Sequence, residues 1–381
     1  MSELTNNNRK SLQAQLLTTV SSLALIGIAL SGSKARATED GERHPTVWVE
    51  LGGQLSGLAD EQEAFAPSLM DGRAPEFSSS TQFEEAPRFS IEEVGSISIE
   101  PHASDWMFKA SVRYGRSLSN KHVRQQTNPK AFITYLSGHR YAKYPSASKF
   151  ADTNSQIGEN HLIIDFQVGK DVGLGLFGTR SSSHLSLGVR FAQFQSASNI
   201  ALKSDPDWHF HYLSLGSRYL PLGGTYHSNL ASLEAARSFR GIGPSISWTG
   251  ATPFLVQRQD SELTFDWGLN AAVLFGRQRA KVHYQTTGHY HTAKYHGSPP
   301  NVYHSTPSHR SVTPPARSRS VVVPNLGAFA GLSFRYNVAK VSFGYRADFF
   351  LGAMDGGIDG HKSYDRNFYG PYATVSIGLG G

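Results

Sequence analysis

The sequence predicts an all-β protein, a transmembrane antiparallel up-and-down β-barrel of about ten strands. Three observations lead to this prediction: an N-terminal segment typical of an export signal, long segments in which apolar and polar residues alternate, and connections that alternate between long and short. The chain of 381 residues also contains 37 glycines and 22 phenylalanines but no cysteine. This composition is typical of strands joined by glycine-containing turns and excludes a disulfide-linked scaffold.

The first 37 residues have the three parts of a secretory signal peptide. Arg9 and Lys10 precede an uncharged stretch whose densest apolar part is Leu23 to Leu30, and Ala35-Arg36-Ala37 supplies a small-x-small cleavage site. A transmembrane anchor is the alternative, but an anchor needs about 20 apolar residues and glutamines and threonines dilute this segment. The sequence therefore predicts cleavage within the precursor.

We expect residues 38–381 to form one outer-membrane barrel with long extracellular loops. The formal net charge is only +6, and removing the basic signal lowers it further. Because no concentrated basic face remains, nucleic-acid binding is excluded. The expected location is the cell outer membrane of a Gram-negative bacterium. The expected partners are membrane lipid and lipopolysaccharide, ions and small polar solutes, with a second copy of the chain as a further candidate.

Alternating segments are the main evidence for strands. They include Trp106–Tyr114, Leu162–Gly169, Leu185–Phe191, Leu263–Phe275 and Val341–Phe349. Side chains alternate across a strand, so each segment has one apolar and one polar or small face. In a soluble sandwich the apolar face would point inward, whereas in a membrane barrel it meets lipid and the polar face lines the lumen. Lengths of about 10 residues and aromatic residues at the ends favour the barrel.

Connection lengths give an independent argument about topology. The expected strands lie near 47–57, 92–100, 106–115, 160–170, 184–195, 235–250, 262–279, 321–336, 341–351 and 367–379. The expected long connections are 58–91, 116–159, 196–234, 280–320 and 352–366. Since such barrels have short periplasmic turns and long outer loops, both termini are expected in the periplasm. A further strand at Leu213 to Leu220 would raise the count to twelve.

The second half resembles a known family. Phe239-Arg240-Gly241-Ile242-Gly243-Pro244 is followed by Gly268–Gly276, then Val323-Pro324-Asn325-Leu326, Gly344-Tyr345-Arg346 and Phe368-Tyr369-Gly370-Pro371. This order, over roughly 160–380, is similar to the Legionella-type major outer membrane protein family of pore-forming barrels. The resemblance implies an outer-membrane pore. The chain departs from many such barrels by ending in Gly380-Gly381 instead of an aromatic residue, and its lack of cysteine rules out any cysteine-linked assembly.

Two motifs could indicate nucleotide or metal binding, but both are better explained as connections between strands. Gly173-x-Gly175-x-x-Gly178 matches a dinucleotide-binding fingerprint, but a strand pattern follows it where a helix is needed. The segment 283–309 is rich in histidine and tyrosine, and His289 and His291 could share a metal ion if the backbone were extended. The prolines of the segment favour a solvated loop. We therefore predict no metal and no cofactor.

A hydrolase with a site at the outer rim is the rival class of function. His161 near Asp165, or His361 near Asp365, could be nominated, but no motif supports either pair and spacing alone fixes no geometry. The sequence predicts a protein that is not an enzyme.

The polar faces of the strands predict the lining of the lumen. Charges there avoid the lipid face, where Arg or Lys costs about 2–4 kcal/mol at the midplane. The residues expected to line the pore are Glu50, Glu100, Lys109, Arg113, Asp165, Arg190, Asp266, Arg335, Arg346 and Asp348. We expect a porin-like pore for ions and small polar solutes. The alternative is a sealed structural or adhesive barrel in which these charges pair across a narrow lumen.

Overall fold

The computed structural model describes residues 47–59, 88–101, 106–126, 135–136, 139–140, 150–172, 182–215, 218–258, 261–294, 302–358 and 360–379. The predicted signal peptide lies outside these residues. Nearly all of the described residues are in β-strands. No helix in this part of the chain is both long and apolar enough to cross a membrane.

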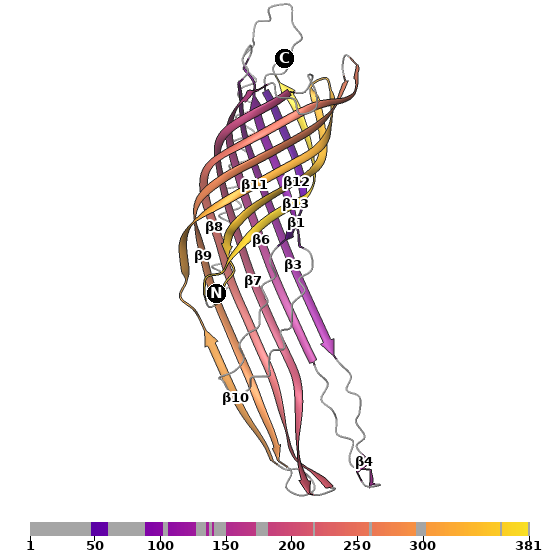
Figure 1. Cartoon of the computed structure of the whole chain (residues 1–381), viewed down its shortest axis with the longest axis vertical. Helices are drawn as coiled ribbons and strands as arrows, with labels where there is room; N and C mark the ends of the chain where they lie inside the picture. The colour runs from indigo at the N-terminus through magenta and orange to yellow at the C-terminus, as the bar shows by residue number, and fades with distance from the viewer. Residues whose placement is uncertain are drawn as a thin grey trace, which may run out of the picture.

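The strands form a closed antiparallel barrel (Figure 1). Their bounds are β1 Val47–Ala59, β2 Arg88–Ile99, β3 Trp106–Gln126, β6 Phe150–Asp171, β7 Ser182–Leu215, β8 Arg218–Arg258, β9 Ser261–Lys294, β10 Val302–Val312, β11 Arg317–Tyr336, β12 Ala339–Asp355 and β13 Ser363–Leu379. The order around the ring is β1-β2-β3-β6-β7-β8-β9-β11-β12-β13, and the pairing of β13 with β1 closes it. A separate hairpin joins β4 Tyr135–Leu136 to β5 His139–Arg140.

The barrel has ten strands around its circumference. The sheet contains eleven, but β10 and β11 both pair with β9, one after the other along its length. They are therefore two parts of one position in the ring, interrupted by Thr313–Ala316. The predicted all-β barrel of ten strands is confirmed. The segment from Leu213 to Leu220 is the paired end of β7 and β8, so it adds no eleventh or twelfth position.

The long connections differ most from the sequence prediction. Residues predicted as loops continue the ladders: β3 and β6 stay paired to Gln126 and Phe150, and β7 and β8 to Leu215 and Arg218. Of the segment 283–309, predicted as a loop, residues 283–294 belong to β9 and residues 302–309 to β10, and these two parts pair with each other. Polar residues in these segments were interpreted as loop, yet hydrogen bonds between strands do not require apolar side chains. Figure 1 shows these strands continuing well past β1, β2, β12 and β13.

The short connections lie at the opposite end of the barrel. The tightest is the turn between β11 and β12, where Asn337 adopts a left-handed conformation with φ of 54°. Asparagine tolerates this conformation better than most residues, which suits a two-residue hairpin turn. Both ends of the barrel sequence, Val47 and Leu379, pair with each other near this end.

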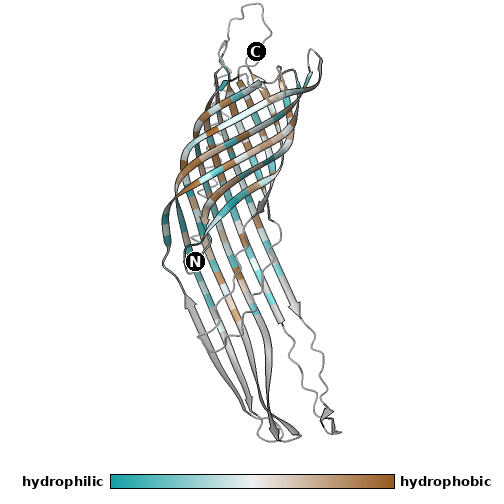
Figure 2. Ribbon diagram, in the orientation of Figure 1, coloured by the Kyte–Doolittle hydropathy of each residue, from teal (hydrophilic) through white to brown (hydrophobic). Residues whose placement is uncertain are grey.

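The outward face of the barrel carries a band of apolar side chains. Figure 2 shows hydrophobic and hydrophilic residues alternating along the strands that carry it. The exposed members include Leu51, Leu55, Ile91, Phe108, Phe166, Leu187, Ile242, Leu269, Phe275, Val322, Leu332, Phe343, Tyr345 and Val375. We call this band the apolar belt. Trp267 belongs to the same face, but only 8% of it is exposed because its ring packs edge-on against Trp248. The expected division of β9 into an apolar and a polar face is confirmed.

Candidate functional site: a charged cavity under an aromatic layer

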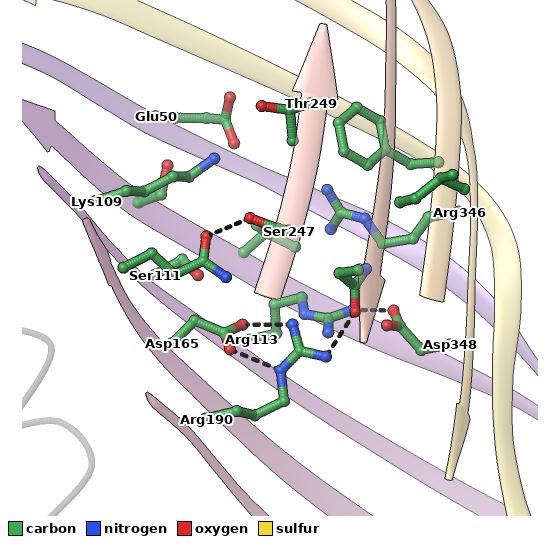
Figure 3. Close-up of a pocket in the computed structure, with 16 residues that line it drawn as sticks. Glu50, Lys109, Ser111, Arg113, Asp165, Arg190, Ser247, Thr249, Arg346 and Asp348 are labelled. Atoms are coloured by element: carbon green, nitrogen blue, oxygen red, sulfur yellow. Dashed lines mark hydrogen bonds and ion pairs between the residues drawn. The ribbon is translucent and has the colours of Figure 1, made fainter. Parts of the chain in front are cut away.

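The interior of the barrel contains a cavity of about 90 Å³ (Figure 3). Short polar side chains on several strands, such as Ser96, Ser111 and Ser247, line this space. A buried water needs roughly 10–15 Å³ by a comparable measure, so the cavity has room for several waters. Its charged lining comes from five strands and consists of Glu50, Lys109, Arg113, Asp165, Arg190, Arg346 and Asp348. These are seven of the ten residues that the sequence predicts in the lumen.

Two ion pairs stabilise the charged wall. Arg190 donates from Nε and Nη2 to the two carboxylate oxygens of Asp165, at 2.6 and 3.1 Å, from the adjacent strand. Its Nη1 also donates to Asn270 at 2.7 Å and to Asn325. Arg113 donates to Asp348 at 2.5 Å from a strand that is not its neighbour in the ring. Both acids and both arginines are therefore neutralised within the wall.

The remaining cavity charges are unbalanced. Lys109 and Arg346 form no ion pair with any residue that the structure describes, whereas Glu50 accepts one hydrogen bond from Ser376 at 3.3 Å. The guanidinium of Arg346 lies 5.6 Å from the ring centre of Phe329 and 5.0 Å from that of Tyr372. Contacts with aromatic rings stabilise the cation without neutralising it. The cavity therefore has a small excess of positive charge.

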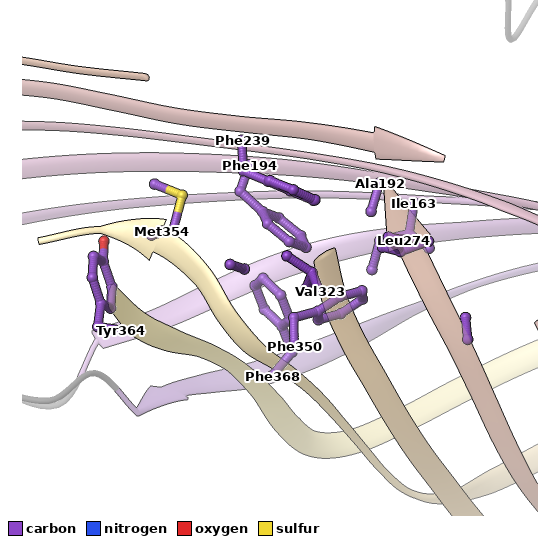
Figure 4. Packing of buried hydrophobic residues seen from close by; sticks show 12 residues of the cluster. Ile163, Ala192, Phe194, Phe239, Leu274, Val323, Phe350, Met354, Tyr364 and Phe368 are labelled. Atoms are coloured by element: carbon purple, nitrogen blue, oxygen red, sulfur yellow. The ribbon is translucent and has the colours of Figure 1, made fainter. Parts of the chain in front are cut away.

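An aromatic layer covers the cavity on the side of the long strands (Figure 4). On β6, β7, β9 and β12 the inward-facing residue two positions beyond the last cavity residue is apolar: Ile163, Ala192, Ala272 and Phe350. We use the name aromatic layer for the whole buried apolar cluster at this level. Its members are Ile163, Ala192, Phe194, Phe239, Ala272, Leu274, Val323, Phe350, Ala353, Met354, Tyr364 and Phe368.

Phenylalanine rings from opposite parts of the wall meet in this layer. The ring centre of Phe194 on β7 lies 4.8 Å from that of Phe350 on β12 and 5.6 Å from that of Phe368 on β13. On its own side, Phe194 stacks on Phe239 at 5.7 Å. Each of these four side chains is at most 1% exposed. Since β7 is separated from β12 by three positions in the ring, these contacts reach across the lumen.

A second set of buried charges lies beyond the aromatic layer. Arg366 on β13 donates to Glu159 on β6, which also accepts from Ser196 at 3.3 Å. Glu92 accepts from Ser56, and its Oε1 lies 3.3 Å from His161 Nε2. The ring of His161 packs against Phe368 with 4.1 Å between centres. The aromatic layer is thus enclosed by charged groups on both sides.

The connection between β12 and β13 folds over this end of the barrel. We call residues 352–362, apart from the undescribed position 359, the cap. Arg317 donates from Nε to Asp355 at 2.9 Å and to the carbonyls of Gly357 and Ile358. Gln278 donates to the carbonyl of Gly352 at 2.7 Å, which anchors the cap to β9. These bonds hold the cap to β11, the neighbour of β12 in the ring, and to β9.

Asp355 is the centre of the cap's attachment. Besides Arg317, its carboxylate accepts hydrogen bonds from the backbone N–H groups of Gly357 at 3.0 Å and Lys362 at 3.2 Å. Burial alone would raise the pKa of Asp355, but these donors outweigh it and lower the pKa below its usual value. Asp355 lies beyond Leu351, the last outward apolar residue of β12. The carboxylate therefore stays ionised at neutral and mildly acidic pH.

Three predicted lumen residues lie outside the cavity. Asp266 accepts from Lys340 at 2.6 Å, and Arg335 donates to Glu262 at 2.5 Å, both toward the short turns. Glu100 is exposed just past the end of β2 and does not line the cavity. The strand ends at Ile99 because Pro101 follows shortly, and proline cannot donate a hydrogen bond to the ladder.

Sequence reasoning missed Glu159, Arg366 and the aromatic layer. Glu159 and Arg366 each lie one residue before a predicted strand start. The alternation of inward and outward side chains was predicted only within the strands, so it did not include them. A signal for the layer does exist. Phe349 and Phe350 are adjacent, as are Phe191 and Ala192, so both faces of these strands become apolar at this level.

The nominated histidine–aspartate pairs are not brought together in the described structure. His161 lies against Glu92, while Asp165 binds Arg190. His361 Nε2 lies 3.2 Å from Gln278 Oε1. Asp365 instead accepts from the backbone N–H of Gly352 at 2.7 Å.

The two weaker motifs are only partly described. The glycine motif 173–178 falls outside the described residues, between two antiparallel strands. His289 and His291 have described backbone on β9, but their side chains are outside the described part.

Comparisons with known proteins give structural neighbours but no family. No family model matches the chain, and no curated protein matches it. The translocator domain of the autotransporter NalP from Neisseria meningitidis is similar at 11% identity and a TM-score of 0.26, over 97% of each chain. The transport unit of the autotransporter AIDA-I from Escherichia coli is similar at 7% identity and a TM-score of 0.24, over 93% of this chain and 97% of that one. The P. putida toluene transporter TodX is similar at 9% identity and a TM-score of 0.19, over 89% and 90%. Likenesses this weak do not indicate an activity for this chain.

Proposed function

We propose that this chain is an outer-membrane pore for ions and small polar solutes that prefers anions, and that the conformation described is its closed state. One observation carries the proposal: a charged cavity with room for several waters lies inside a barrel whose outward face is apolar. An apolar exterior suits lipid, and polar residues inside suit a water-lined path. The resemblance of the sequence to Legionella-type pore-forming barrels agrees with this proposal.

The imbalance of charge supports the anion preference. An ionised group buried without a partner costs several kcal/mol in a dry interior. Lys109 and Arg346 face the cavity without carboxylate partners in the described structure, so water or a passing anion is their natural counterpart. Selectivity in such pores follows from wall charge and width. The positive excess therefore favours small anions such as chloride.

Closure would then come from the aromatic layer and the cap. Apolar constrictions block ions because water leaves them, and the phenylalanine contacts across the lumen form such a constriction. The cap adds a second obstacle beyond it. Opening requires both to move, so we expect brief openings separated by long closed periods.

Single-channel recording from the purified, refolded full-length protein in a planar bilayer tests the proposal. The expected result is discrete current steps with a reversal potential in a salt gradient that indicates anion preference. A stable absence of current in the wild type and in variants that open the aromatic layer would contradict the proposal.

The aromatic layer itself favours a second candidate, a sealed structural barrel. In that case the buried charges would serve only to hold the strands together, as Arg190 and Asp165 do. Variants that remove the rings of the layer distinguish the candidates. A pore would conduct more, whereas a sealed barrel filled by other side chains would still pass no current.

A further inference from the structure

A group of basic side chains lies on the outward face just beyond the apolar belt. Arg240 on β8 and Arg277, Arg279 and Lys281 on β9 are all exposed. Each continues the outward parity of its strand, following Ile242 on β8 and Phe275 on β9, which are 54% and 59% exposed members of the belt. We call these four residues the basic patch. It lies at the level where a surrounding lipid would change from acyl chains to headgroup.

Two of these arginines face each other directly. Arg240 and Arg277 are cross-strand partners in the ladder between β8 and β9. Like charges opposite each other on one face of a sheet destabilise the pairing. Neither guanidinium forms an ion pair with a carboxylate among the described residues. This arrangement is unfavourable in isolation, but it becomes favourable when an anion binds between the two groups.

Both guanidinium groups are held in position by neutral partners. Arg240 donates from Nε and Nη2 to the side-chain oxygen of Gln193, at 3.2 and 3.0 Å. Arg277 donates from Nε to the hydroxyl of Ser318 at 2.7 Å. These bonds orient the side chains without neutralising them. The remaining N–H groups are available for a planar, bidentate contact with phosphate oxygens.

On β7, β8, β9 and β11, no described carboxylate side chain lies on the outward face at the level of the basic patch. At the same level the outward residues are Gln193 and Gln195 on β7, Ser238 on β8, and Ser318 and Ser320 on β11. The nearest described outward carboxylate, Glu234, lies opposite His283, beyond Lys281. Arg279 and Lys281 extend the positive surface along β9. The patch therefore has room and charge for more than one phosphate group.

A different part of the rim shows that this clustering is specific to β8 and β9. Arg116 on β3 is also exposed on the outward face, but its cross-strand partners are Asn160 and Ile91, a member of the belt. It is a single charge without a cationic neighbour in the ladder. It provides a control position with one exposed arginine.

We propose that the basic patch binds the phosphorylated sugar headgroup of lipopolysaccharide in the outer leaflet, with its acyl chains against Ile242, Phe275 and Val322. This inference rests on the proposed outer-membrane location and on the long strands facing outward, but not on conduction. Lipid phosphate is favoured over free phosphate because the arginines border an apolar surface that only a lipid would cover. It also explains how two opposed arginines are accommodated on the outward face.

The test measures binding of purified lipopolysaccharide to the detergent-solubilised full-length protein by microscale thermophoresis. The double variant Arg240→Gln and Arg277→Gln should weaken binding about tenfold or more, as expected when several charge-assisted hydrogen bonds are lost. Arg116→Gln should change it less than about twofold. Heat-modifiable mobility on gels shows that each variant folds.

Two further measurements identify the source of the phosphate. Lipopolysaccharide stripped of phosphate by acid should bind the wild type as weakly as intact lipopolysaccharide binds the double variant. Inorganic phosphate at millimolar concentration should not displace the lipid. Equal affinities for the wild type and the folded double variant, undiminished binding of stripped lipid, or full displacement by inorganic phosphate would each overturn the proposal. A conduction failure leaves these binding results unaffected, so the two proposals can fail separately.

Discussion

The aromatic layer and the cap obstruct the same lumen by different means. The layer is made of twelve buried apolar residues from seven strands that pack across the barrel, so its stability depends on area removed from water. The cap is held mainly by hydrogen bonds that converge on Asp355 and Arg317. The comparison indicates that the layer should be the stronger barrier and insensitive to pH, and the cap the weaker and the pH-sensitive one.

Removing two rings of the aromatic layer should have the largest effect. Phe194→Ala with Phe350→Ala deletes the shortest contact across the lumen, 4.8 Å between ring centres. We expect conductance to rise severalfold, and each truncation to cost about 3–5 kcal/mol of stability where packing is not replaced. Planar-bilayer recording and thermal unfolding on gels measure both.

Phe343→Ala is the matched control for the layer, since Phe343 is 64% exposed on the outward face. It should leave conductance unchanged. An equal rise in conductance in the control would mean that loosening the barrel, and not opening the layer, increases the current.

Weakening the cap should have a smaller effect than opening the layer. Asp355→Asn keeps the size of the side chain but removes the charge that Arg317 and two backbone N–H groups bind. We expect more frequent openings with little change in conductance per opening, because the layer still limits the width. Single-channel open probability is the measurement. Glu234→Gln, a change to an exposed carboxylate on β8, should leave it unchanged, and a matching increase there would contradict the role of the cap.

The response to pH should separate the two barriers. The pKa of Asp355 is lowered in the folded protein, so its contribution to the cap is complete above the ordinary carboxyl pKa of about 3.9 and is lost as pH falls through the lower folded value. Open probability should therefore stay constant from about pH 8 to pH 4 and rise only in more acidic solution. Asp355→Asn should abolish that rise. A wild-type rise centred near neutral pH would indicate that another group controls the cap.

Selectivity should change least, and it should change more for residues at the cavity than for residues outside it. Arg346→Gln removes one unpaired positive charge, so the reversal potential in a salt gradient should shift by several millivolts toward cation preference. Asp266→Asn should give a smaller shift, because Asp266 pairs with Lys340 outside the cavity. A larger shift for Asp266→Asn than for Arg346→Gln would place the narrowest charged region at the short turns.

The pattern of apolar and polar residues was sufficient to predict the strands of the barrel but not the contacts between side chains in its lumen. Apolar and polar residues alternate with a period of two within each strand, so the ten strand positions could be predicted from the sequence. The same alternation places residues such as Arg113, Asp165 and Asp348 in the interior. The partners of these residues depend on the stagger between strands, which no single segment encodes. Arg113 meets Asp348 across 235 positions of sequence.

The ends of the strands were the least predictable feature. Strands β7 and β8 continue into sequence rich in serine, histidine and glycine, where alternation of apolar residues fades. Their pairing is maintained by backbone hydrogen bonds and by a small inward-facing cluster of Ile200, Ala231, Leu233, Ala235, Val282 and Tyr284. Because that cluster is formed by three strands together, it has no signature in any one of them.

The unequal length of the strands has a consequence for self-association. Within the described residues, β10 pairs only with β9, so beyond the closed ring it presents an open sheet edge. Such an edge can recruit a strand from another molecule and start a growing fibre. Pro307 lies within β10, and Pro314 and Pro315 separate it from β11. Because a proline has no backbone N–H to donate, β10 and its link to β11 present an interrupted template to a strand from another molecule.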